Sequence, residues 1–174
     1  MKDVLKAIAD RSSTRAYTEE KLTEEELEIL INAGLQAPTA ANKQEIHFTV
    51  IKGDHPVLKE IQDELEKERK ANGHNFFYEA PVVFILSGDS SFHWSGVDAG
   101  IAAQNLALAA EGLGLGSLII GCIRNVMTGE KMAYFNQALQ IPEGYVYEIA
   151  VAVGHKAAEK IPHLYSAVKN VTCL

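Results

Sequence analysis

The segment RSSTRAY, residues 11–17, places two arginines around three hydroxyl side chains just before a strong helix start. An arginine fork matches the oxygens of a phosphate group, and hydroxyls or backbone N–H groups can complete the cradle. The segment is therefore a candidate phosphate site. The alternative is a solvated turn whose arginines pair with nearby carboxylates such as Glu19 and Glu20.

The amino-acid composition helps to decide between a phosphate site and a solvated turn. Of the 174 residues, 47% are hydrophobic and 22% are charged, which is ordinary usage for a globular protein. The net charge of −7 argues against a nucleic-acid-binding face, because such a face is basic. A local basic cluster is more informative in an acidic chain than in a basic one, and residues 11–17 form such a cluster.

Length and residue usage also indicate domain organisation and compartment. A chain of this length commonly forms one domain, here residues 1–174. The first residues lack the apolar run of a signal peptide, and no uncharged run is long enough to span a bilayer. The two cysteines, Cys122 and Cys173, form no CxxC pair, and the six histidines show no zinc-ligand spacing. We expect a cytoplasmic protein without a metal site, and with neither a membrane nor nucleic acid as partner.

Several catalytic and nucleotide-binding motifs are incomplete or absent. Gly112, Gly114 and Gly116 look like a dinucleotide loop, but the GxGxxG pattern requires glycine where Ser117 stands. The run also leaves a helix and enters a strand, the reverse of the dinucleotide-binding order, so a glycine helix stop explains it better. No GxxxxGK[ST] or GxSxG sequence occurs, and Cys122 lies among apolar residues, which favours an inert buried thiol.

Two further segments carry binding features. The loop PTAANKQE, residues 38–45, supplies Thr39, Asn42 and Gln44, and its two alanines would let a flat ligand lie close. Asn and Gln side chains both donate and accept, as a pyrimidine-like ring edge requires. Alternatively, the polar groups of this loop satisfy only its own backbone. The Gly-rich strand entry before residues 120–121 could bring bare backbone N–H groups against a ligand.

A phosphate site, an amide-rich loop and a bare backbone edge occur here without an obvious catalytic acid, base or nucleophile. That combination suggests that a cofactor supplies the chemistry. Flavin mononucleotide (FMN) carries both a phosphate and a pyrimidine-type ring edge, and it is the cofactor that these residues favour.

The elements that must position these segments follow from periodicity and capping signals. Thr23 and Glu26 predict a capping box for a helix that ends at Pro38. The apolar run VVFILS, residues 82–87, suits a strand buried on both faces. The other helices are expected at 1–9, 56–71, 95–111 and 128–139, and the other strands at 46–51, 117–123 and 145–153. Helices separate most of the strands, which predicts one α/β or α+β domain.

The sequence resembles the FMN-dependent nitroreductase family over nearly its whole length. RSSTRAY is similar to the family's Arg-x-Ser-x-Arg-x-Phe/Tyr segment, and APTAANKQ to its Ala-Pro-Ser-Ser-x-Asn-x-Gln loop. FFYEAPVVFIL resembles its Ala-Pro strand entry. DAGIAAQNLALAAEGLGLGSLIIG resembles its central Gln-Asn helix and Gly-Leu-Gly-Ser strand, and is the most specific of the four matches.

The resemblance implies an α+β fold with a central mixed or antiparallel sheet flanked by helices, in an interlocked homodimer with FMN at the subunit interface. It also implies the residues that hold FMN. These are Arg11, Ser12, Ser13 and Arg15 for the phosphate, ribityl chain and pyrimidine ring; Pro38, Thr39, Ala40, Asn42 and Gln44 in the loop given by the partner subunit; Ile120 and Gly121, whose backbone would lie near flavin N5; and Asn75.

The chain departs from the family pattern at Ser12, where many members have arginine or histidine, in its short length, and at two further places. Glu45 stands where the family loop has proline, and the C-terminal basic pair that clamps the phosphate is replaced by Lys160 and His163 as the nearest candidates. Arg69, on the charged helix expected at 56–71, is not expected to contact the cofactor.

The resemblance further implies an oxidoreductase in which NAD(P)H delivers hydride to flavin N5. An electron acceptor, such as a nitroaromatic or a quinone, then takes the hydride in ping-pong order, without a catalytic side chain. The alternatives are another flavin chemistry on the same scaffold (dehydrogenation, dehalogenation or ring fragmentation) and a flavin-binding storage or sensor protein with little turnover.

Overall fold

The computed structural model describes residues 3–70, 73–158 and 170–174. The helices in these ranges are α1 (Val4–Asp10), α2 (Glu24–Leu35), α3 (Pro56–Arg69), α4 (Ser95–Gly112), α5 (Arg124–Thr128) and α6 (Met132–Ala138), with a 3-10 turn η1 (Ala40–Asn42). The strands are β1 (His47–Lys52), β2 (Val82–Asp89), β3 (Gly116–Ile120) and β4 (Tyr145–Gly154).

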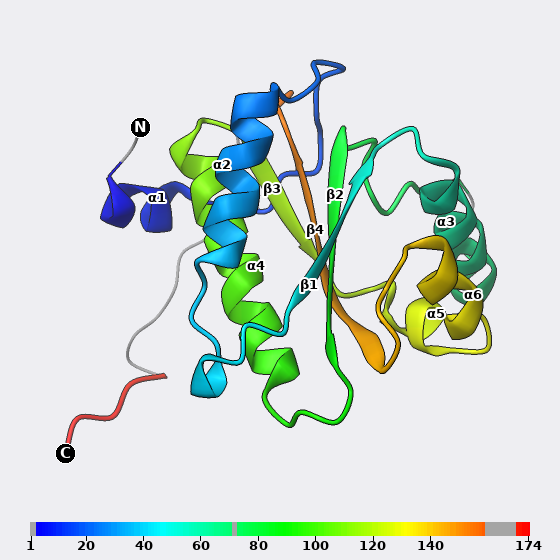
Figure 1. Cartoon of the computed structure of the whole chain (residues 1–174). Helices are drawn as coiled ribbons and strands as arrows, with labels where there is room; N and C mark the ends of the chain where they lie inside the picture. Colours follow the sequence, from blue (N-terminus) through cyan, green and yellow to red (C-terminus); the bar gives the residue numbers. More distant parts are fainter. Residues whose placement is uncertain (1–2, 71–72, 159–169) are drawn as a thin grey trace.

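These four strands form one sheet in the order β1-β2-β4-β3, and each neighbouring pair is antiparallel. Figure 1 shows α2 and α4 on one side of the sheet and α3, α5 and α6 on the other. The expected α+β class, with a central sheet between helices, is confirmed. Because β3 is an edge strand, one side of its backbone faces away from the sheet.

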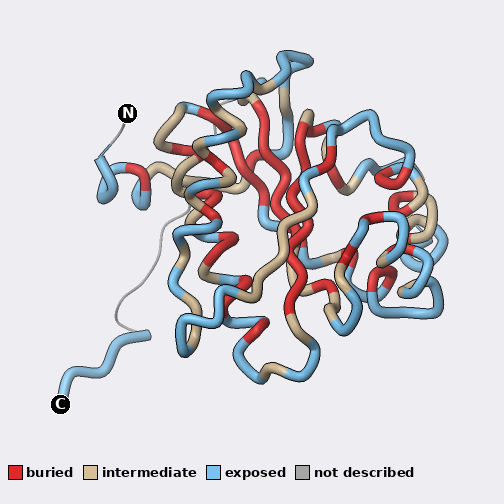
Figure 2. Tube along the Cα trace, in the orientation of Figure 1, coloured by how far each residue is buried: buried red, intermediate tan, exposed pale blue. Residues whose placement is uncertain are grey.

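Strand β2 lies between two hydrophobic cores. All its residues from Val82 to Gly88 are buried, as the run VVFILS predicts. Ile85 belongs to the core beneath α3, whereas Phe84 and Leu86 belong to the core beneath α4. Successive side chains of a strand point to opposite faces, so a strand covered on both faces is apolar throughout. Figure 2 shows the buried residues concentrated along the strands.

Two predicted helix ends are confirmed. At the start of α2, Thr23 Oγ1 accepts from the Glu26 N–H at 3.1 Å, and the Glu26 carboxylate accepts from the Thr23 N–H at 2.8 Å. After α4, Gly114 has φ of +83°, the left-handed backbone that favours glycine at a helix stop. The glycine run is therefore a turn that leads α4 into β3.

Two predicted elements differ from the structure. The strand expected at 117–123 ends at Ile120, because the chain then turns and the Gly121 carbonyl accepts from the Arg124 N–H at 3.2 Å. The helix expected at 128–139 is interrupted at Gly129, whose backbone is extended. A Cβ at this position would lie 2.5 Å from the Asn125 carbonyl oxygen, so the tight turn between α5 and α6 requires glycine.

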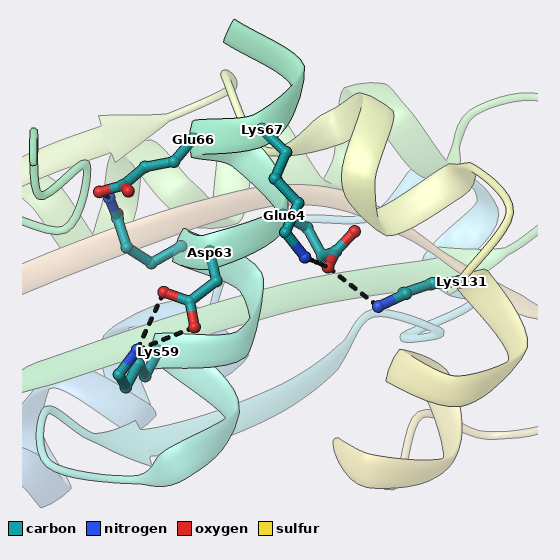
Figure 3. A network of polar contacts seen from close by, with 7 residues as sticks. Lys59, Asp63, Glu64, Glu66, Lys67 and Lys131 are labelled. Atoms are coloured by element: carbon teal, nitrogen blue, oxygen red, sulfur yellow. Dashed lines mark hydrogen bonds and ion pairs between the residues drawn. The ribbon is translucent and has the colours of Figure 1, made fainter. Parts of the chain in front are cut away.

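The outer surface of α3 carries ion pairs (Figure 3). Lys59 lies 2.8 Å from Asp63, and Glu64 accepts from Lys67 and Lys131 at 2.6 and 2.9 Å. These two lysines hold the pKa of Glu64 below its ordinary value. Exposed pairs of this kind contribute little to stability, so substitutions here make suitable controls.

Several large apolar side chains remain exposed on α1, α2 and α4. They are Val4, Leu5, Ile8, Leu35, Trp94 and Val97. Val4, Leu5 and Ile8 recur at helical spacing on α1, and all three are exposed within the described chain. Among the described helices, none is long and apolar enough to cross a membrane.

Candidate functional site

Residues 11–17 meet the outer edge of β3 at Ser13 and Thr14 and then pass to the residues that follow β4. Ser13 forms a parallel bridge with Ser117, and the Thr14 N–H donates to the Ser117 carbonyl at 2.9 Å. Backbone hydrogen bonds therefore hold this part of the segment against the sheet.

Tyr17 anchors the other end of the segment. Its backbone forms an antiparallel bridge with Lys156, and its hydroxyl donates to the Thr14 carbonyl at 3.2 Å and the Ala152 carbonyl at 3.4 Å. Burial raises the pKa of the Tyr17 hydroxyl, which therefore stays protonated and remains a donor. Between the buried Thr14 and the half-buried Tyr17, the side chain of Arg15 is exposed.

The two arginines of this segment differ in exposure. Arg11 is half-buried and Arg15 is exposed. In the ranges that the structure describes, neither guanidinium forms an ion pair, and Glu20 instead lies 3.9 Å from His155. The alternative reading, a solvated turn with arginines paired to neighbouring glutamates, does not describe this segment.

A largely buried ion pair between Lys156 and Glu111 stabilises the backbone next to Tyr17. Lys156 Nζ lies 2.9 and 3.1 Å from the two carboxylate oxygens of Glu111, and these side chains are 15% and 3% exposed. The pair joins the end of α4 to the residue that bridges with Tyr17. Sequence reasoning gave neither residue a role, because they lie 45 positions apart.

The outer edge of β3 continues from Ser117 to Gly121. The Ser117 carbonyl points outward, since it accepts from Thr14. Alternate residues of an antiparallel edge strand direct both backbone groups to the same side, so the N–H and C=O of Ile119 and the N–H of Gly121 also point outward. Ile119 is 39% exposed and Gly121 is exposed. The structure thus brings residues 120–121 and 11–13 to one edge.

Arg69 lies closer to this edge than its place on a charged helix indicates. Its Nη2 donates to the Cys122 carbonyl at 3.4 Å, directly after Gly121. Burial raises the pKa of the Cys122 thiol, so little thiolate forms at neutral pH and the thiol is a poor nucleophile.

The loop at residues 38–45 has a strained backbone. Ala41, Asn42 and Gln44 each adopt φ of +53°, in the left-handed region that residues other than glycine rarely occupy. Thr39 Oγ1 accepts from the Gln44 N–H at 2.9 Å, and Gln44 Nε2 donates to Asn42 Oδ1 at 3.3 Å. Part of the polar content of the loop therefore satisfies the loop itself. Strained backbone of this kind clusters at functional sites.

Asp98 holds this loop against the start of α4. Its carboxylate is 2% exposed and accepts from the Ala40 N–H at 2.9 Å. Close by, Glu45 Oε1 accepts from the Ser95 hydroxyl at 3.4 Å, so Glu45 faces its own subunit. No role was predicted for Asp98 from the sequence. A carboxylate within an apolar helix of small residues was the signal that could have indicated one.

Replacing Asp98 with alanine should lower the free energy of unfolding by about 1–3 kcal/mol, because the Ala40 N–H loses a charged acceptor. Urea denaturation measures this change. Asp98→Asn keeps an oxygen that accepts from the Ala40 N–H, so its free energy of unfolding should fall clearly less than that of Asp98→Ala. Equal losses in the two variants would contradict the role given to the hydrogen bond.

One subunit does not bring the loop and residues 11–17 together (Figure 1). The loop is fixed to α4 at Asp98, whereas residues 11–17 lie near Glu111, at the other end of this helix. Thirteen residues separate Asp98 from Glu111 (111 − 98 = 13), or about 20 Å at 1.5 Å per residue.

Four other residues were predicted to contact the cofactor: Asn75, Pro38, Lys160 and His163. Asn75 is exposed, and its Oδ1 accepts from the Phe77 N–H at 2.9 Å, which caps the turn leading to β2. Pro38 is exposed at the start of the loop. Lys160 and His163 lie outside the described residues.

The structure is that of an α+β protein in which an arginine- and hydroxyl-bearing segment is attached to the edge of the sheet. The profile of the Nitroreductase family matches residues 8–155, and the chain belongs to this family.

Relatives and solved structures agree with this assignment. The chain is 28% identical to a putative NADH dehydrogenase/NAD(P)H nitroreductase of Archaeoglobus fulgidus, over 92% of this chain and 89% of that protein. It is 30% identical to FMN reductase (NADPH) of Bacillus subtilis, over 90% of this chain and 67% of that protein. A nitroreductase with bound FMN from Desulfitobacterium hafniense has a TM-score of 0.89 at 28% identity, over 100% and 99% of the two chains.

Proposed function

We propose that this protein is an NAD(P)H-dependent FMN oxidoreductase. The observation that carries the proposal is the outer edge of β3. The segment that contains Arg11 and Arg15, neither with a described ion-pair partner, attaches there at Ser13 and Thr14, and backbone groups of the edge point outward. Membership of the nitroreductase family supports it, as do relatives named FMN reductase (NADPH) and FMN reductase [NAD(P)H].

The residues at this edge fit FMN. A phosphate dianion requires cations and hydroxyl donors, which Arg11, Arg15, Ser12 and Ser13 supply. A flavin ring edge requires alternating donors and acceptors, which the backbone of Ile119 and the N–H of Gly121 supply. We assign the phosphate to the first group and the ring to the second.

Bound FMN would supply hydride transfer, first from NAD(P)H to flavin N5 and then from N5 to an electron acceptor such as a nitroaromatic or a quinone. The chain's own residues hold the phosphate, orient the ring and direct a backbone donor toward it. The Cys122 thiol, with its raised pKa, is not required as a nucleophile. Because both substrates use one edge, they bind in turn, which favours ping-pong kinetics.

Titration of the purified protein with FMN should show saturable binding and a yellow complex, and the released cofactor should be FMN rather than FAD. Initial rates of NADPH and NADH oxidation at several acceptor concentrations should give parallel double-reciprocal lines. Intersecting lines would contradict the shared site. Saturable FMN binding with little turnover on any acceptor would favour storage or sensing, and the absence of binding would contradict the flavin assignment itself.

The compartment is a further part of the proposal. Both cysteines are free; Cys122 is half-buried and Cys173 is exposed. Exposed free thiols are typical of a reducing compartment, so we place the protein in the cytoplasm.

We also propose a homodimer in which the loop of each subunit completes the edge site of the other. The separation of about 20 Å along α4 and the exposed apolar groups on α1, α2 and α4 support this assembly. On α4, Gly96 and Gly100 are exposed, and such small residues let a second helix approach closely; Gln104 is exposed on the same helix. Asn105, the neighbour of Gln104, is used within its own chain: its Nδ2 donates to the Ala33 carbonyl at 3.1 Å.

Light scattering should therefore give twice the chain mass of 19.0 kDa. Gly100→Glu should yield a folded monomer that has lost tight FMN binding, because a Cβ at Gly100 meets nothing within 4 Å in its own chain. Lys59→Glu, on the outer surface of α3, should remain dimeric. A Gly100→Glu protein that stays dimeric and binds FMN normally would rule out this face as the interface.

A further inference from the structure

Tyr147 is a buried polar residue to which the proposed function has not yet given a role. It lies on β4, is completely buried, and its hydroxyl donates to the Ile120 carbonyl at 2.8 Å. Burial raises the pKa of this hydroxyl above its ordinary value, so it stays protonated and remains a donor. A phenylalanine would fill the same space without the cost of burying a hydroxyl, which points to a role for the hydrogen bond.

The bond fixes the orientation of the Ile120–Gly121 peptide. Ile120 pairs with Ala150 of β4, and its carbonyl points toward β4 and the Tyr147 hydroxyl. None of the described peptide bonds is cis. In a trans peptide the C=O and the N–H point in opposite directions, so the Gly121 N–H points away from β4. That direction is the outer edge of β3, to which Ser13 and Thr14 are attached.

The position of this peptide makes its orientation important. Gly121 lies one residue beyond the end of β3, where the chain turns toward α5. A peptide at the end of a strand is less constrained than one within the ladder, because its neighbours on one side are not paired. The Tyr147 hydroxyl supplies a constraint from the interior and leaves the exposed side of the peptide open.

We propose that Tyr147 is a positioning residue that aims the Gly121 N–H at N5 of FMN. This inference rests on the proposed function. Tyr147 does not itself touch the cofactor, because it acts from the core through the Ile120 carbonyl. A donor held at N5 in advance binds the ring without the cost of ordering the peptide during binding.

The test compares Tyr147→Phe with Tyr145→Phe, a matched variant on the same strand whose ring packs against the same core. Three quantities are measured: the Gly121 amide resonance of the apoprotein, the N5 resonance of bound ¹⁵N-labelled FMN, and the Kd for FMN. Tyr147→Phe should move the amide resonance, shift N5 downfield as it loses a hydrogen bond, and raise the Kd about fivefold, the effect of one weakened hydrogen bond. Tyr145→Phe should leave all three unchanged.

The outcomes separate this inference from the proposed function. An unchanged Gly121 amide in Tyr147→Phe, or a shifted amide with an unchanged N5 resonance, would overturn the positioning role. A lower Tm without either spectral change would show that the hydroxyl serves stability only, and would also overturn it. If the wild-type protein bound no FMN, the proposed function would fail and the assignment to N5 with it, while the apoprotein amide would still report whether Tyr147 orients Gly121.

Discussion

Gly116→Ala should abolish tight FMN binding while leaving the protein folded. A Cβ at position 116 would lie 2.5 Å from Thr14 Oγ1 and 2.8 Å from Thr14 Cβ, so Thr14 must move away from β3. Because Thr14 lies between Ser13 and Arg15, its displacement carries the phosphate-binding groups with it. Hydrogen bonds to charged groups contribute about 1.5–3 kcal/mol each, so loss of two should raise the Kd by roughly a hundredfold or more. Isothermal titration calorimetry measures this change.

Gly53→Ala is the matched control for this prediction. Its Cβ would lie 2.2 Å from the Ala80 carbonyl oxygen, in the turn between β1 and α3, remote from the edge of β3. Overpacking costs about 1–3 kcal/mol of stability, so this variant should have a lower Tm and an unchanged FMN affinity. If both variants lost affinity in proportion to their loss of stability, the contact between Gly116 and Thr14 would have no specific role.

Arg11→Ala and Arg15→Ala should each weaken FMN binding by roughly 10- to 150-fold, the equivalent of one charge-assisted hydrogen bond of about 1.5–3 kcal/mol. The decisive comparison is with riboflavin, which has the same ring but no phosphate. The wild-type protein should prefer FMN to riboflavin, and each variant should lose most of this preference while its riboflavin affinity changes little. Equal losses for both ligands would show that the arginines act on the fold or the ring rather than on the phosphate.

Lys59→Ala provides the charge control. It removes the same unit charge from a lysine that pairs with Asp63 on the outer surface of α3. Arg69 is unsuitable for this purpose, although it lies on the same helix, because it donates to the Cys122 carbonyl beside Gly121. A general effect of net charge would appear in the Lys59 variant as well.

The sequence predicted those parts of the fold whose signals are local. The capping box at Thr23, the buried run of β2 and the glycine stop after α4 each depend on a few consecutive residues. The break at Gly129 was not predicted, because it depends on the close approach of the Asn125 carbonyl rather than on a helix-breaking pattern. The helix at α1 was predicted, but a periodic apolar pattern does not say whether its own chain or another one covers it.

The residues of the candidate site also fall into two groups, those that were predicted from the sequence and those that were not. Composition and resemblance supplied the residues that would contact FMN, since these carry recognisable side chains. The residues that hold them in place were not predicted, because each acts through one contact with a residue far away in the sequence. These residues are Thr14 against Gly116, Asp98 beneath Ala40, Lys156 on Glu111 and Tyr147 behind Ile120. No local pattern encodes such pairs.

The length of α4 has a genetic consequence. Since it separates the loop from residues 11–17 within one chain, the two segments of a chain belong to different sites in the proposed homodimer, and changes in them would affect different sites when two altered chains assemble. In a dimer of one chain altered at Arg15 and one altered at Asn42, one site receives both defects and the other receives none. Two alleles that are each inactive alone would therefore complement when expressed together, whereas two alleles altered in the same segment would not.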